Sequence, residues 1–135
     1  MLEMPPTLDT RFFLTHFLAD TEDLRKRPSK KMSNLQRAMT IVPAIVLHEV
    51  YKFQFENIGM DVAELRLDTI MKSGFTLVDL DPKIALTSAR LRCRHKELRT
   101  ADTIVAATAI ETRSSRVVSD DPHFREIKTI KSEWI

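Results

Sequence analysis

The stretch RTADTIVAATAI, at residues 99–110, decides how this chain folds. Thr100 is a favourable N-cap residue and predicts a helix from Ala101 to about Thr112. The side chains on the turns beyond Asp102 are small and apolar: Val105, Ala106 and Ala109. Such a face can pack closely against a sheet. Asp102 stands at its beginning, where the helix dipole favours a negative charge.

Short apolar runs alternate with helical patterns on both sides of this stretch. Strands are predicted at residues 7–8, 39–42, 75–78, 116–119 and 127–130. Helices are predicted at about 12–18, 30–38, 43–57, 61–72, 82–98 and 101–112. This alternation indicates an α/β fold, with a short and mostly parallel central sheet covered by helices.

Proline, glycine and aspartate residues mark several helix ends. Pro43 is expected at the first position of a helix that stops before Gly59. Asp61 is expected to cap the next helix, and Gly74 to end it in the left-handed conformation. Asp81-Pro82 is expected to start the helix that follows.

Length and composition favour a single globular domain over residues 1–135. With one cysteine, Cys93, no intramolecular disulfide can form, so a reducing interior is the natural environment. The N-terminus does not have the pattern of a signal peptide. The longest apolar run, Ile41–Leu47, is far shorter than the ~20 residues of a membrane span. We expect a cytoplasmic protein that does not interact with membranes.

Basic residues are concentrated in two regions, 25–31 and 90–99, although the net charge is only +2. Such clusters are suited to a polyphosphate ligand such as RNA. A solvated loop and a solvated helix face are the alternative interpretations of the two clusters.

Acidic residues occur where the predicted strands end. Asp9 follows the first strand, while Asp120 and Asp121 follow a later one, so all three should face the same edge of the sheet. Glu49 lies on or beside the buried stripe of its helix, and Asp102 heads the small-residue helix. Ionised carboxylates on apolar faces are costly unless they are paired, hydrogen-bonded or bound to a metal. Together these acids suggest a site for a hard cation, Mg²⁺ or Mn²⁺.

Each acid also has a structural interpretation. Asp9 and Asp102 could cap or support helices, and Asp121 could belong to an Asx turn. Glu49 could pair with Lys52 or with an arginine. Two other classes of acidic site are excluded by the residues around Asp9. Receiver domains need an acidic pair near the first strand, and phosphatases with an Asp-x-Asp start need a second aspartate where Arg11 stands.

Four segments resemble the signatures of PIN-domain nucleases, in the family's order and spacing: LDTRFFL at 8–14, AIVLHEVYK at 44–52, RTADTIVAATAI at 99–110 and VVSDDPHF at 117–124. The resemblance spans nearly the whole chain. It is closest to the small VapC-type ribonuclease toxins and their archaeal relatives. The third segment is the most specific of the four. The resemblance implies a three-layer α/β/α PIN-like fold.

The resemblance makes Asp9, Glu49, Asp102 and Asp121 the catalytic and metal-binding acids, with Asp120 as a further metal ligand. Asp121 is preferred to Asp120 because the family's acid stands three residues before a phenylalanine, here Phe124. The resemblance also implies that the hydroxyl groups of Thr10 and Ser119 support the site. The cationic residues expected to bind RNA are Arg11, Arg99, Lys30 and Lys31. Arg11 stands where many family members have Asn or Ser.

The resemblance further implies a Mg²⁺- or Mn²⁺-dependent endoribonuclease that hydrolyses RNA phosphodiester bonds, as the toxin of a type II toxin–antitoxin pair. A homodimer and an antitoxin protein are the partners it implies. The aromatic residues of helix 44–58 are more numerous than one buried face needs, which is consistent with an interface there. Two alternatives remain: a PIN-domain protein of RNA processing, and a PIN domain that binds RNA or protein without cleavage.

Overall fold

A parallel sheet of five short strands forms the centre of the protein in its computed structural model, which describes residues 4–17 and 34–134. The strand order is β3-β2-β1-β4-β5, and every neighbouring pair is parallel. The strands are β1 (Thr7–Leu8), β2 (Ile41–Pro43), β3 (Thr76–Val78), β4 (Val117–Val118) and β5 (Ser132–Glu133).

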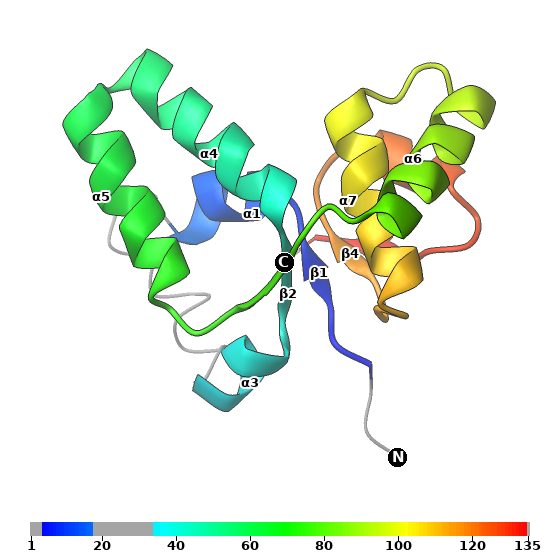
Figure 1. Cartoon of the computed structure of the whole chain (residues 1–135), viewed down its shortest axis with the longest axis horizontal. Coiled ribbons are helices and arrows are strands. Elements are labelled where there is room, and N and C mark those ends of the chain that lie inside the picture. Colours follow the sequence, from blue (N-terminus) through cyan, green and yellow to red (C-terminus); the bar gives the residue numbers. More distant parts are fainter. Residues whose placement is uncertain (1–3, 18–33, 135) are drawn as a thin grey trace.

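Helices cover both faces of the sheet, as Figure 1 shows, with α4 and α5 as one pair, α6 and α7 as another, and β1 and β2 between them. The α-helices are α1 (Thr10–Phe12), α3 (Asn34–Met39), α4 (Ala44–Asn57), α5 (Met60–Met71), α6 (Pro82–Arg94) and α7 (Thr100–Glu111). A π-helix, η1 (Phe13–Phe17), continues α1, and a 3₁₀ helix, η2 (Pro122–Glu126), follows β4. The predicted α/β/α architecture with its parallel sheet is confirmed.

Helix α7 is the buried centre of one helical layer. Its residues from Asp102 to Ala109 are all buried, and it contacts β1, β2 and β4 as well as α6 and α4. A helix that is apolar on all sides is suited to a position inside the protein. Because Ala106 and Ala107 have small side chains, α7 can approach the sheet closely while α6 covers its other side.

The register of β1 and β4 positions the residues that follow them. Leu8 pairs with Val118, so Asp9 and Ser119, the next residues of the two strands, emerge side by side at the carboxyl edge. Leu8 is fully buried, and so are Phe12 and Phe13 just beyond it. Because buried residues lie both before and after Asp9 in the sequence, the backbone at Asp9 is held in position at the edge of the sheet.

Several predicted boundaries are wrong. Helix α6 ends at Arg94 rather than near Leu98, because the backbone leaves the helical region at His95 and Leu98 then turns into the core. The proposed strand at 127–130 is absent: Ile127 packs into the core after η2, and the last described strand is β5. Met39 belongs to α3 and is exposed, so β2 begins only at Ile41.

Three predicted helix caps also differ from the structure. The N-cap of α5 is Gly59, with φ of 134°, and Asp61 lies within the first turn instead. Thr100 is the first residue of α7 and Arg99 is its N-cap. Pro43 ends β2 and is the N-cap of α4, one position before the helix. Asp81 does cap α6, since its Oδ1 accepts a hydrogen bond from the Ile84 amide at 2.8 Å.

Among the described helices, none has both the length and the apolar character that crossing a membrane would require.

Close packing of α7 should make it intolerant of larger side chains. We expect Ala106→Leu to lower the free energy of unfolding by about 1–3 kcal/mol, because a buried position in contact with its neighbours has no room for the added atoms. The matched control is Ala89→Leu on the exposed face of α6, which should change the same quantity by less than about 0.5 kcal/mol. Urea unfolding measures both, and equal effects would contradict the packing described for α7.

Candidate active site

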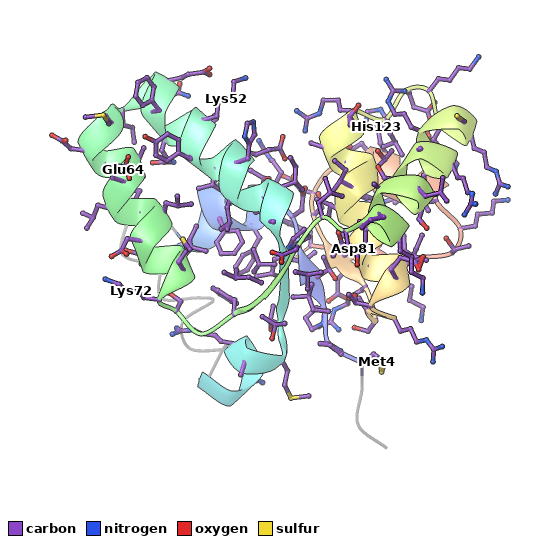
Figure 2. All side chains as sticks on the ribbon, in the orientation of Figure 1. Met4, Lys52, Glu64, Lys72, Asp81 and His123 are labelled. Atoms are coloured by element: carbon purple, nitrogen blue, oxygen red, sulfur yellow. The ribbon has the colours of Figure 1, made fainter. Side chains whose placement is uncertain are left out.

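An open pocket of about 980 Å³ lies where β1, β2 and β4 end. All five acids singled out from the sequence line it: Asp9, Glu49, Asp102, Asp120 and Asp121. They come from the loops after β1 and β4 and from helices α4 and α7. Figure 2 labels two further lining residues, Lys52 and His123, at one end of the molecule, and Met4 at the other. The acids are therefore brought to one place from four separate segments.

Asp9 is one of the two buried acids of the pocket, together with Asp102. Only 3% of Asp9 is exposed, and its Oδ2 accepts a hydrogen bond of 2.7 Å from the Ser119 hydroxyl. Burial raises the pKa of Asp9 to about 6, and the nearby charges of Asp102 and Glu49 act in the same direction. Hydrogen bonds from Ser119 and from the Thr10 backbone offset part of this rise.

Glu49 of α4 is hydrogen-bonded to α1, the short helix that begins directly after Asp9. Its Oε1 accepts a hydrogen bond of 2.8 Å from the Thr10 hydroxyl, and its Oε2 lies 3.9 Å from Nη1 of Arg99. The side chain is 18% exposed, which agrees with its predicted position beside the buried stripe of α4. Lys52, the other partner considered for it, lies 3.7 Å from Glu56 instead.

Asp102 enters the pocket from the first turn of α7. Its side chain is only 3% exposed, and the Arg99 guanidinium donates to both of its oxygens, from Nε to Oδ2 and from Nη2 to Oδ1, each at 3.1 Å. The carboxylate is thus buried behind an arginine that is itself mostly exposed. Paired donation of this kind is the strongest geometry for an arginine and a carboxylate.

The two neighbouring acids after β4 have different partners. Asp120 forms a two-bond ion pair with Arg11, at 3.0 and 3.2 Å. The Asp121 amide donates to the Ser119 hydroxyl at 3.1 Å, and the same hydroxyl donates to Asp9. Asp121 also begins η2, since its Oδ1 accepts from the His123 amide at 2.9 Å and lies 2.8 Å from His123 Nδ1. The Asx-type role considered for Asp121 is therefore real, and it coexists with a place in the pocket.

The residues assigned to RNA binding are distributed differently from the acids. Arg11 and Arg99 line the pocket, but each is paired with one of its carboxylates. Lys30 and Lys31, together with the basic cluster at 25–31, lie outside the described residues.

Five titratable residues that line the pocket were not predicted for this site: His48, Lys52, Glu56, Glu97 and His123. The helical spacing of Ile45, Glu49 and Lys52 in α4 contained a signal for Lys52, because residues three or four apart share a face.

The donor set around Asp9 is compatible with a hard cation. Three carboxylates contribute only oxygen atoms, the type of ligand that Mg²⁺ and Mn²⁺ prefer. A positively charged guanidinium already lies between Asp102 and Glu49. The donor chemistry of Asp9, Glu49 and Asp102 therefore suits a divalent ion, while their ligand atoms do not all lie within 4.8 Å of one another in this structure.

Comparison with solved structures finds proteins of similar fold. The DNA-bound VapBC structure from Salmonella typhimurium is 19% identical and has a TM-score of 0.75, with 96% of this chain and 97% of that chain covered. VapC20 from Mycobacterium tuberculosis, described as a sarcin-ricin loop cleaving toxin, is 14% identical with a TM-score of 0.75, covering 90% and 94%. FitAcB from Neisseria gonorrhoeae is 18% identical with a TM-score of 0.69, covering 94% and 95%.

No match is found among curated proteins. The solved structures show likeness of fold at these levels of identity. The family is shown by sequence: residues 7–130 match the PIN domain model, and the four segments that carry the acids all lie within that range. The chain therefore belongs to the PIN domain family.

Proposed function

We propose that this protein is a Mg²⁺- or Mn²⁺-dependent endoribonuclease that hydrolyses RNA phosphodiester bonds. The observation that carries the proposal is the convergence of Asp9, Glu49 and Asp102 from β1, α4 and α7 into one pocket. Membership of the PIN domain family supports a nuclease. An RNA substrate is supported by the similar fold of VapC20, a toxin described as cleaving the sarcin-ricin loop.

In this proposal the chain's own residues hold and orient a cation. Asp9, Glu49 and Asp102 are the ligands, with Asp121 as the fourth acid and Asp120 at the rim. The Ser119 hydroxyl orients Asp9, and the Thr10 hydroxyl orients Glu49. A bound divalent ion supplies an activated water and stabilises charge on the phosphodiester during its hydrolysis. The buried walls of the pocket strengthen these electrostatic interactions.

We also propose that the protein is the toxin of a type II toxin–antitoxin pair and forms homodimers. Similar folds occur in VapBC structures from Salmonella typhimurium and Rickettsia felis and in a toxin–antitoxin complex from Klebsiella pneumoniae. Apolar side chains that are about half exposed on α4 and just beyond it give the surface for a partner: Phe53, Phe55 and Ile58. RNA cleavage by such a toxin would take place in the cytoplasm.

Loss of one acid should abolish cleavage without unfolding the protein. We expect Asp102→Asn to lower the rate of RNA cleavage at least about 100-fold, since even residues that only support metal ligands contribute about 10–100-fold. The matched control is Asp68→Asn, an exposed aspartate paired with Lys72 on α5, which should retain full activity. Cleavage of a labelled RNA measures both variants, and circular dichroism confirms their folding. Equal activity of the two variants would show that the acids are not the active site.

Metal dependence should be visible in both binding and activity. Treatment with EDTA should stop RNA cleavage, and Mg²⁺ or Mn²⁺ should restore it. Calorimetric titration of the metal-free protein with Mn²⁺ should show a binding site that Asp9→Asn loses. A protein that binds RNA without cutting it need not take up metal, so an absent calorimetric signal would favour that alternative.

Burial of Asp9 should make the metal-free protein sensitive to pH. Between about pH 4 and 6 the folded protein keeps a proton that the unfolded chain releases, so rising pH favours unfolding. Relative to Asp9→Asn, the parent should lose about 3 kcal/mol of unfolding free energy across this range, with full stability below it. Urea unfolding of both proteins at several pH values measures the difference, which should be absent if Asp9 titrates normally.

A further inference from the structure

The guanidinium of Arg99 lies between acids of the pocket, where a bound metal ion would also have to lie. Its guanidinium uses Nε and Nη2 for the two oxygens of Asp102, while Nη1 lies 3.9 Å from Oε2 of Glu49. Two of the three candidate ligands therefore face one positive side chain. Asp102 makes the largest contribution to raising the pKa of Arg99, and Glu49 and Asp9 raise this pKa further.

The arginine can leave this position more easily than the acids can. Its side chain is 70% exposed, whereas those of Asp102 and Glu49 are 3% and 18% exposed. Asp9 and Glu49 are also held by hydroxyl groups, of Ser119 and Thr10, that do not involve the arginine. Movement of Arg99 toward solvent would leave these acids oriented in the pocket.

The spacing of the acids agrees with a guanidinium between them rather than a metal ion. Among the described residues, three potential ligand atoms gather within 4.8 Å of one another at His95, Glu97 and Glu126, but not at Asp9, Glu49 and Asp102. A guanidinium is larger than a divalent ion, so oxygens arranged around it stand farther apart than oxygens that share Mg²⁺ at about 2.0–2.1 Å.

We propose that Arg99 is the internal counter-ion of this acidic site, and that a divalent cation must displace it in order to bind. The inference rests on the proposed metal-dependent function and adds a regulation of that same site. The guanidinium neutralises the acids while no metal is present, and it competes with the metal for the oxygens of Asp102. The guanidinium and a divalent cation repel each other when both contact Asp102. A guanidinium at Asp102 therefore lowers the affinity of the site for the cation.

Calorimetric titration with Mn²⁺ tests this competition in four full-length proteins. In Arg99→Gln the competing charge is removed, so the Kd for Mn²⁺ should fall at least about fivefold below that of the parent. Arg99→Lys keeps a charge but not the paired donors, so its Kd should lie between those two. The matched control is Arg116→Gln, which breaks the arginine–carboxylate pair with Glu133 outside the pocket and should leave the Kd unchanged.

Thermal unfolding gives a second readout that does not involve activity. Without Arg99 the acids of the metal-free protein repel one another, whereas bound Mn²⁺ neutralises them. Arg99→Gln should therefore lower the melting temperature of the metal-free protein more than that of the Mn²⁺-saturated protein. An arginine with a purely structural role would lower both temperatures equally, and that result would overturn the proposal.

The calorimetric outcomes separate this inference from the proposed function. If the parent and Arg99→Gln bind Mn²⁺ with equal Kd, or the variant binds it more weakly, the counter-ion role is wrong while the metal site stands. If Arg99→Gln keeps the parent's Kd but loses RNA affinity in EDTA, Arg99 is an RNA contact instead. If neither protein binds Mn²⁺, the proposed metal-dependent function fails and this inference fails with it.

Discussion

Burial of negative charge at the carboxyl edge of the sheet is the constraint on which the rest of the structure depends. Asp9 is fixed there because β1 is the central strand and Leu8, Phe12 and Phe13 anchor it on both sides. Asp102 and Glu49 are brought to the same edge by helices whose other residues are needed for the core. The free energy of packing is large enough to hold together charges that would separate in water.

The parts of this arrangement that follow from local patterns could be predicted from the sequence. The apolar runs around Leu8, Val42 and Val117 predicted three of the parallel strands. Because the carboxyl ends of parallel strands meet at one edge of the sheet, this also predicted that Asp9 lies near Asp120 and Asp121. The small residues beyond Asp102 predicted a helix packed on the sheet. Each of these predictions depends on the pattern of apolar and small residues within a single strand or helix, which can be read directly from the sequence.

The parts that depend on tertiary contacts could not be predicted. The sequence 127–130 has the apolar character of a strand, but Ile127 is needed in the core after η2, and pairing with β4 passes to Ser132 and Glu133. Arg11 and Arg99 were assigned to RNA because a sequence shows their charge and not their partners. Which carboxylate an arginine meets depends on side-chain directions that arise only when distant segments pack together.

Asp121 differs from the other acids in that it belongs to the architecture of the chain's last segment as well as to the pocket. One of its oxygens begins η2 through the His123 amide, and η2 leads to Phe124 and Ile127, both buried in the core. A change in this carboxylate's surroundings would thus be transmitted to the packing of the tail that ends at the sheet's edge. Replacing Asp121 would therefore alter the packing of this last segment as well as the pocket.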